Sequence, residues 1–290
     1  MRNLDALPWM DREAIKVASY RPSPLFYRKL PHTAVMTSRG CPHECAFCCS
    51  DRRLRKRAVE DVIDEINWLK NRHGIMEVTF YDEAFTLDRD RAARFCEIML
   101  EKGIKLSWSA NSRVDCVDLP LLRIMKKAGC WRILYGLESG VDKNLRAVAK
   151  GATVQQGREA VRLTNLAGIE SLGTFLFGIP GESFRDGLET IRFATSLKLD
   201  YALFLHLCPL PGSSLYKKIF SQYNTTNFAS MTGFIPCFDS ACMTRSEQEK
   251  LMETAFRRFY FRIPYFLRRL GAIRSVGDVI RHAQGLGLML

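Results

Sequence analysis

The sequence lacks a continuous apolar run long enough to span a bilayer, and its first residues, MRNLDALPWMDREAIK, lack the apolar core of a secretory signal. It also lacks internal repeats and low-complexity tracts. These absences argue against an integral membrane or secreted protein and predict a cytoplasmic chain. The 290 residues, 47% hydrophobic and 26% charged, are typical of a globular protein that buries a large core.

Acidic residues are comparatively few, 31 against 43 Lys and Arg, and the formal net charge is +12. Such a balance suits nucleic acid, an anionic membrane surface or an anionic small substrate. The basic residues are spread along the chain, except in Asp51–Arg57 and in an Arg-rich C-terminal segment. A solvated surface explains most of them, so charge alone does not choose among these partners.

Cysteine is plentiful, with ten residues. In a cytosolic chain, clustered cysteines indicate metal or redox chemistry, whereas scattered ones are usually buried. Cys237 and Cys242 form a loose pair with no third or fourth ligand nearby, which argues against a metal site there. Four scattered cysteines are predicted to be packing residues: Cys96, Cys116, Cys130 and Cys208.

Short β-rich runs alternate with helix-period segments from about residue 33 to residue 207. The runs are apolar at most positions, as in parallel strands buried on both faces. The expected strands are His32–Ser38, Met76–Asp82, Ile104–Asn111, Trp131–Ser139, Ile169–Ile179 and Tyr201–Pro209. The expected helices are Val59–Arg72, Asp88–Lys102, Leu119–Ala128, Thr153–Ala167 and Phe184–Leu197, with a further helix from about Ser246 to Leu270.

Six βα units with right-handed crossovers predict an α/β fold, a partial (β/α)6 TIM-like barrel with active-site loops at the carboxyl ends of its strands. A doubly wound sheet is the alternative, but a cysteine loop, not a Gly-rich nucleotide fingerprint, follows the first strand. We expect a lead-in or linker at residues 1–31, the barrel core at 32–210 and a helical C-terminal extension at 211–290.

The loop TSRGCPHECAFCCS places Cys41, Cys45 and Cys48 in the spacing C-x3-C-x2-C. Three thiolates on one short loop can hold three irons of a [4Fe–4S] cluster and leave the fourth iron open to a substrate or cosubstrate. A structural zinc site would need a fourth ligand. His43 is available, but it lies inside the loop, where reaching the same ion would be strained.

This spacing, with Phe47 before the last cysteine, resembles the signature of the radical S-adenosylmethionine (radical SAM) enzymes. Five later segments resemble successive strand ends of the branch (class B) that usually carries an N-terminal cobalamin-binding domain: FYDEAFTLDRDRAARFCEIM, WSANSRVD, LLRIMKKAGCWRILYGLESG, LFGIPGES and PLPGSSLY. The opening LDALPWMDREAI is similar to the linker between that domain and the barrel. The resemblance covers nearly the whole chain.

The resemblance implies that Cys41, Cys45 and Cys48 bind the cluster, while the SAM amine and carboxylate chelate its fourth iron. One-electron reduction then gives methionine and a 5′-deoxyadenosyl radical, which abstracts hydrogen from a substrate. Phe47 is expected against the adenine of SAM. Cys49 matches no ligand position.

Further SAM contacts are expected at the later strand ends. Tyr81-Asp82-Glu83 replaces the Gly-Gly-Glu that binds the SAM amine in many members, so Asp82 or Glu83 is a candidate acceptor, with a helix-capping turn as the alternative. Arg113 could bind the SAM carboxylate or form a surface salt bridge.

The fourth and later strand ends add candidates. Glu138, assisted by Ser139, suits the ribose hydroxyls or the SAM amine. Gly178 in GIPGES allows the backbone to approach the adenine, and Ser183 could cap the following helix. His206 faces either the substrate or the core.

The sequence therefore predicts a radical SAM enzyme that acts on a small or lipid-like substrate with an electron donor such as ferredoxin or flavodoxin. It contains no Asp-x-His-x-x-Gly cobalamin motif, so we expect cobalamin only in trans, from a separate cobalamin-binding protein. A radical methyltransferase assisted in this way is the alternative function.

A catalytically reduced relative that binds a membrane surface or nucleic acid is a further alternative, because arginines interleave with aromatics in Phe256–Arg274. The simpler interpretation is an amphipathic helix that packs its aromatics over the open side of the barrel and leaves its arginines in solvent. Nucleic acid is the less favoured partner.

Overall fold

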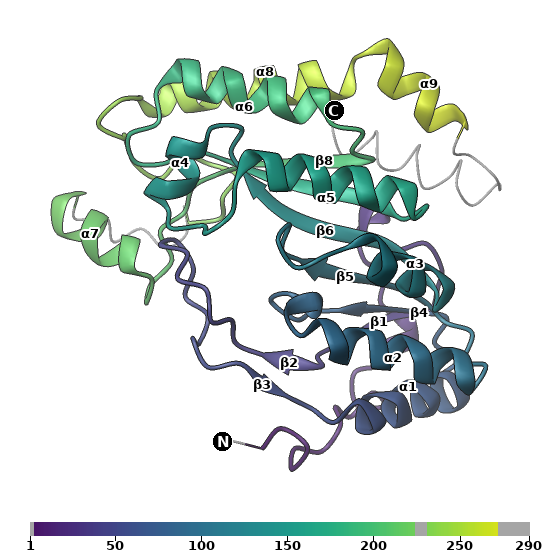
Figure 1. The fold of residues 1–290 in the computed structure, drawn as a ribbon. Helices are drawn as coiled ribbons and strands as arrows, with labels where there is room; N and C mark the ends of the chain where they lie inside the picture. The colour runs from purple at the N-terminus through teal and green to yellow at the C-terminus, as the bar shows by residue number, and fades with distance from the viewer. Residues whose placement is uncertain (1–2, 224–230, 272–290) are drawn as a thin grey trace.

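The computed structural model describes residues 3–223 and 231–271 (Figure 1). Its main sheet has six parallel strands in the order β1-β4-β5-β6-β7-β8, so each strand pairs with the next of the main strands along the chain. The strands are β1 (His32–Val35), β4 (Glu77–Phe80), β5 (Ser107–Ser112), β6 (Cys130–Glu138), β7 (Glu170–Phe177) and β8 (Tyr201–His206). This arrangement confirms the predicted α/β fold and partial barrel.

Helices return the chain to the start of each next strand. They are α1 (Val59–His73), α2 (Arg89–Glu101), α3 (Leu119–Lys127), α5 (Val154–Leu166) and α6 (Phe184–Ser196). Side-chain caps start four of them: Asp88, Asp118, Thr153 and Ser183 each accept a hydrogen bond from a backbone N–H in the first turn. The capping role predicted for Ser183 is confirmed.

The core lies between the sheet and these helices. Phe80 of β4 lies against three other aromatic rings, with centroids 4.9 Å away at Phe85, 5.2 Å at Phe95 and 5.3 Å at Trp108. All four rings are buried. They join β4 and β5 to α2, so the carboxyl ends of these strands stand on a tightly packed base.

Several short elements were not predicted. A two-stranded antiparallel ribbon, β2 (Ser38–Arg39) with β3 (Arg55–Lys56), brackets the cysteine loop, so the first predicted strand is split and β1 ends at Val35. The remaining additions are 3-10 turns η1 (Val17–Ser19), η2 (Pro24–Phe26) and η3 (Phe85–Leu87), and helices α4 (Asp142–Ala147) and α7 (Ser214–Tyr223). Such short elements have too few residues to show a periodic pattern.

The predicted C-terminal helix is two helices, α8 (Arg245–Tyr260) and α9 (Ile263–Gly271). The break falls at Phe261 and Arg262, because Pro264 has no N–H to donate to the Tyr260 carbonyl and therefore cannot continue α8. Helix α8 packs against α6 and β8, and the rings of Phe256 and Phe259 lie 5.6 and 6.1 Å from that of Phe204. The aromatics of α8 are therefore packed in the fold as predicted, but against α6 and β8 and not over the open side of the barrel.

The prediction that the arginines of this segment are solvated is wrong for α9. Arg262 and Arg268 donate to the carbonyl oxygens of Thr195 and Leu199, and Arg269 pairs with Asp200 at 3.0 Å. Backbone carbonyls at the end of α6 and the start of β8 attract the cations inward. Residues 272–274 of the segment lie outside the described residues. Within the described ranges, we find no helix long and apolar enough to cross a membrane.

Candidate active site

The residues predicted for the site gather at one edge of the sheet, because parallel strands present all their carboxyl ends together. Figure 1 shows the β2–β3 ribbon and α7 at this edge, on the left. Each strand contributes near its end: the cysteine loop after β1, Asp82 and Glu83 after β4, Arg113 after β5, Glu138 and Ser139 at β6, Gly178 after β7, and His206 at β8.

The cysteine loop is closed by backbone contacts at its base. Gly40 has φ +90°, and a Cβ there would lie 2.3 Å from the carbonyl oxygen of Arg53, so only glycine fits. The Cys41 N–H donates to the Asp51 carbonyl at 2.8 Å. The Arg52 guanidinium lies across the loop and donates to the Cys48 carbonyl at 3.4 Å. These contacts hold the residues before the cysteines against those after them, where the chain continues into β3.

All three motif cysteines are free thiols, with Cys45 buried and Cys41 and Cys48 half-buried. Arg113 Nη1 lies 3.8 Å from Cys45 Sγ. Burial raises the pKa of the Cys45 thiol, while the positive charges of Lys150 and Arg113 oppose that rise. Among the described residues, no three His, Cys, Asp or Glu side chains converge on a position for one metal ion.

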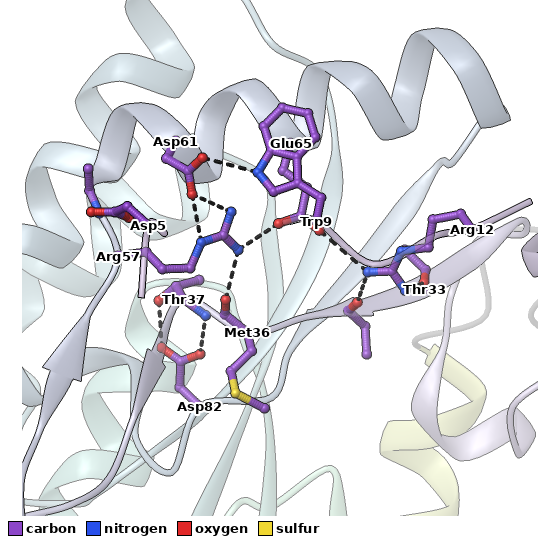
Figure 2. Close-up of polar contacts among 12 residues, drawn as sticks. Asp5, Trp9, Arg12, Thr33, Met36, Thr37, Arg57, Asp61, Glu65 and Asp82 are labelled. Carbon is purple, nitrogen blue, oxygen red and sulfur yellow. Dashed lines mark hydrogen bonds and ion pairs between the residues drawn. The ribbon is translucent and has the colours of Figure 1, made fainter. Parts of the chain in front are cut away.

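Asp82 supports the cysteine loop from below. Its buried carboxylate accepts hydrogen bonds from the Thr37 N–H at 2.7 Å and the Thr37 hydroxyl at 2.5 Å (Figure 2). It also accepts from the Ser38 hydroxyl at 2.7 Å. Burial raises the pKa of Asp82, and these hydrogen bonds oppose the rise. The structure thus gives Asp82 a different task from the predicted SAM contact, whereas Glu83 is exposed.

Arg57 ties the N-terminal lead-in to the same region (Figure 2). It donates to the Met36 carbonyl at 3.0 Å and pairs with Glu65 of α1 at 2.6 Å. Trp9 from the lead-in donates to Asp61 of α1 at 3.0 Å. Sequence reasoning missed this network, because nothing in the local pattern marks Arg57 as different from other basic residues.

Arg113 is buried and already paired. Its Nε and Nη2 bind the two carboxylate oxygens of Asp115 at 2.9 and 2.8 Å, and Nη2 also donates to the Lys150 carbonyl at 2.8 Å. Burial lowers the Arg113 pKa, but the hydrogen bond and charge of Asp115 outweigh this effect and raise it overall. The guanidinium therefore reaches Cys45 from a fixed position, and the predicted surface salt bridge is a buried one.

Glu138 forms a buried ion pair with Lys150, 2.7 Å apart. The backbone of Glu138 has φ +59°, which is strained for a non-glycine residue and accompanies a register shift between β6 and β7. Gly136 leaves the necessary space, since a Cβ there would lie 2.4 Å from Glu138 Oε1. Lys150 was missed, because it lies twelve residues further along the chain, in a loop.

Ser139 is buried and joins two helices. Its hydroxyl bonds the Thr190 hydroxyl of α6 at 3.0 Å and accepts from Asn144 of α4 at 3.2 Å.

Glu182 organises the turn that contains Gly178, and sequence reasoning missed it. Its buried carboxylate accepts from the N–H groups of Gly178 and Ile179 at 2.7 and 3.1 Å. Burial raises the Glu182 pKa to about 8, although these hydrogen bonds oppose the rise. Gly178 has φ +87°, and a Cβ would lie 2.4 Å from Gln248 Oε1. The turn is therefore held by a carboxylate four residues further along the chain.

The ends of β7 and β8 carry an apolar cluster beside the cysteine loop. It contains Ile179, Leu207 and Leu215, with half-buried Phe47 and Cys237 packed against it. His206 is 98% buried in the core, in line with the core alternative. Its Nδ1 has no partner among the described residues, and burial lowers its pKa to about 4.

The scattered cysteines divide into two kinds. Cys96 and Cys130 are buried, as predicted, and burial raises the Cys96 pKa to about 12. Cys116 and Cys208 are half-buried. Cys208 shares a hydrogen bond with the Cys237 thiol, so the partner of Cys237 is not its sequence neighbour Cys242, which is exposed.

Comparisons with known proteins show which family this chain resembles. The sequence model of the radical SAM superfamily matches residues 35–194. An uncharacterized methyltransferase of Pyrococcus horikoshii is 33% identical over 268 residues, covering 90% of this chain and 57% of the relative. The anaerobic magnesium-protoporphyrin IX monomethyl ester cyclase of Cereibacter sphaeroides is 31% identical, covering 79% of this chain and 39% of the relative.

A solved structure has the same fold. The radical SAM methyltransferase TsrM of Kitasatospora setae, with cobalamin and a [4Fe–4S] cluster bound, has a TM-score of 0.62 at 19% identity, covering 76% of this chain and 46% of TsrM. The chain spans little more than half of the Pyrococcus relative and about two-fifths of the Cereibacter one. The match over residues 35–194 shows that this chain belongs to the radical SAM superfamily.

Proposed function

We propose that this chain binds a [4Fe–4S] cluster through Cys41, Cys45 and Cys48 and cleaves SAM at the carboxyl edge of its sheet. The observation that carries the proposal is the position of three free thiols on one loop at that edge, beside Arg113 and Lys150. Nearby cations favour thiolates, and each cysteine of a cubane cluster binds a separate iron. The donor set therefore suits a cluster.

When bound, the cluster supplies the electron that cleaves SAM into methionine and a 5′-deoxyadenosyl radical. Around it, we assign Phe47 and the Gly178 backbone to the adenine, Glu138 to the ribose, and Glu83 to the SAM amine. Arg113 is held by Asp115 and reaches Cys45, so we assign it to the cluster thiol in place of the SAM carboxylate.

Anaerobic reconstitution with iron and sulfide tests the proposal. We expect bound iron and, with a chemical reductant, formation of 5′-deoxyadenosine from SAM. Substituting any one motif cysteine by alanine should abolish both. The matched control is Cys49→Ala, which removes the adjacent exposed thiol and should keep both. Iron binding and SAM cleavage by the C41A variant would refute the assignment.

The substrate is proposed to be a small or lipid-like molecule, and a small redox protein such as ferredoxin or flavodoxin is the proposed electron donor. Methyl transfer is the second candidate, because the Pyrococcus relative is named a methyltransferase and TsrM contains cobalamin. Formation of S-adenosylhomocysteine only when cobalamin is added would support this candidate, and formation without cobalamin would exclude it.

A further inference from the structure

The edge of the barrel opposite the cysteine loop carries a broad basic hollow of about 1050 Å³. Its floor includes the apolar side chains of Met76, Leu100 and Trp131. Six cationic residues line it, and no carboxylate is among its described lining residues. The cations are Arg28, Lys29, Lys70, Lys105, Lys126 and Lys127.

Helix dipoles explain only part of this charge. Lys70 occupies the last turn of α1, and Lys126 and Lys127 that of α3, where cations compensate the partial negative charge of the carboxyl end. Lys29 and Lys105 lie in loops before β1 and β5, where no helix end requires them. The excess of positive charge is thus a property of the surface.

Helix α9 presents an apolar face to solvent. Its arginines point inward, to the Leu199 carbonyl and to Asp200. Ile263, Phe266 and Leu267 are 76%, 58% and 63% exposed. This is the reverse of a solvated amphipathic helix, whose apolar side faces the protein. An exposed apolar patch of this kind indicates an interaction surface.

The hollow and α9 lie at the same edge of the molecule. The hollow is at the beginnings of β5 and β6, and α9 is anchored at the beginning of β8, so the parallel sheet places both at its amino edge. Figure 1 shows α9 at the upper right and the carboxyl ends of α3 and α2 below it on the same side, away from the β2–β3 ribbon.

A stack of side chains connects the two features. The Arg132 guanidinium lies 4.1 Å from the ring centroid of Trp131 and 4.5 Å from that of Tyr201. The Arg269 guanidinium also lies 4.5 Å from the Tyr201 ring centroid. The acidic residue between the features, Glu170, pairs with Arg132 at 3.1 Å. A second carboxylate, Asp200, pairs with Arg269 at 3.0 Å, so both negative charges have a cationic partner.

We propose that this edge docks on an anionic lipid surface, with the exposed apolar residues of α9 inserted among the lipids and the lysines of the hollow facing the headgroups. Apolar insertion combined with basic charge is the general mode of peripheral membrane binding. The cysteine loop then faces away from the membrane.

Nucleic acid fits these contacts less well. Phe259 is buried, and the hydroxyls of Tyr260 and Tyr265 donate to the carbonyls of Ala202 and Asp200 at 2.6 and 3.0 Å. These three aromatics are therefore engaged in the fold and are not free to stack on bases. Phe261 and Phe266 are exposed, but the neighbouring Arg262 and Arg268 donate to backbone carbonyls and not outward to phosphates.

Sedimentation of the full chain with vesicles tests the proposal. We expect binding to mixed phosphatidylcholine and phosphatidylserine vesicles at low salt, and roughly tenfold weaker binding at high salt or to phosphatidylcholine alone. The triple variant Ile263→Ser, Phe266→Ser, Leu267→Ser should weaken binding roughly tenfold, because it removes the inserted side chains. K105E/K127E should weaken it by a similar factor.

K217E/K218E is the matched control, since it reverses two exposed charges on α7 at the opposite edge and should leave binding unchanged. The substituted side chains are exposed, so unfolding temperatures should stay close to that of the parent. Three results would overturn the proposal: equal binding to neutral vesicles, variants that bind like the parent, or α9 substitutions that instead dissolve a dimer. A fourth result would assign the hollow to nucleic acid: the parent binds single-stranded RNA but not vesicles, and K105E/K127E no longer binds the RNA.

Discussion

Asp82 and Glu83 are neighbours in the chain, but their side chains have different environments. Asp82 is buried beneath the cysteine loop, where three donors converge on its carboxylate, and Glu83 is exposed. The sequence pattern identified the pair but could not distinguish the two, because both lie in the bend after β4, where no periodic pattern shows which side chain is buried.

Asp82→Asn should destabilise the protein by roughly 1–3 kcal/mol, because the amide replaces one acceptor oxygen with a donor and leaves buried donors unpaired. We expect a lower unfolding temperature and less retained iron after reconstitution. Glu83→Gln should change neither. If Asp82 instead bound the SAM amine, D82N would keep its stability and iron, and only the KM for SAM would rise.

Glu182 predicts a pH dependence on the alkaline side. Its pKa is about 8 in the folded chain against an ordinary value of 4.5, so between these values the folded state holds a proton that the unfolded state has released. Its contribution to stability is complete below pH 4.5 and is lost as the pH rises through 8.

Glu182→Gln should reduce this loss, because the glutamine carbonyl can still accept from Gly178 and Ile179 while its amide does not titrate. Denaturant unfolding at several pH values would measure it. If the unfolding free energy of E182Q fell with pH as steeply as that of the parent, Glu182 would not be the source of the alkaline loss of stability.

At the scale of elements, the two-residue strands β2 and β3 matter more than their length suggests, because they close the loop that holds three cysteines. The closure depends on Gly40, where backbone oxygens of Arg53 and Asp51 would lie 2.3 and 2.7 Å from a Cβ. Backbone atoms cannot move aside as the end of a flexible side chain can.

Gly40→Ala should therefore open the ribbon and reduce iron retention. Gly74→Ala is the matched control: Gly74 also has positive φ, at +63°, but a Cβ there meets nothing within 4 Å. We expect G74A to cost roughly 1–2 kcal/mol from backbone strain alone and to retain iron. Equal iron contents in the two variants would mean that the ribbon does not hold the loop.

For the whole molecule, two buried histidines predict acid sensitivity. His32 and His206 each have a pKa lowered to about 4 by burial, against an ordinary value of 6.5. Between these values the unfolded chain binds protons that the folded chain does not, so stability falls as the pH falls from 6.5 to 4.

Unfolding should therefore take up about two protons near the middle of this window, measured as the slope of the unfolding free energy against pH. His206→Asn should remove about one of them, whatever its effect on stability at neutral pH. An unchanged slope in H206N would exclude this histidine as the source.

Much of the barrel was predictable, because each βα unit has a local pattern: apolar strands, amphipathic helices and polar helix starts such as Ser183. The spacing of Cys41, Cys45 and Cys48 lies within eight residues, so the motif could be recognised without any fold. Glu182 could not be assigned, since its partners depend on how the turn after β7 folds back.

The sequence by itself determined the order of strands and helices and the spacing of the three cysteines in the loop, because both depend on residues close together in the chain. Only the tertiary structure decided which polar groups from distant parts of the chain meet: Arg113 with Cys45, and Lys150 with Glu138. It also turned the arginines of α9 inward, to carbonyls and a carboxylate at the start of β8. The physical reason is burial: a charged group inside a fold must find a partner, and the partner can come from any part of the chain.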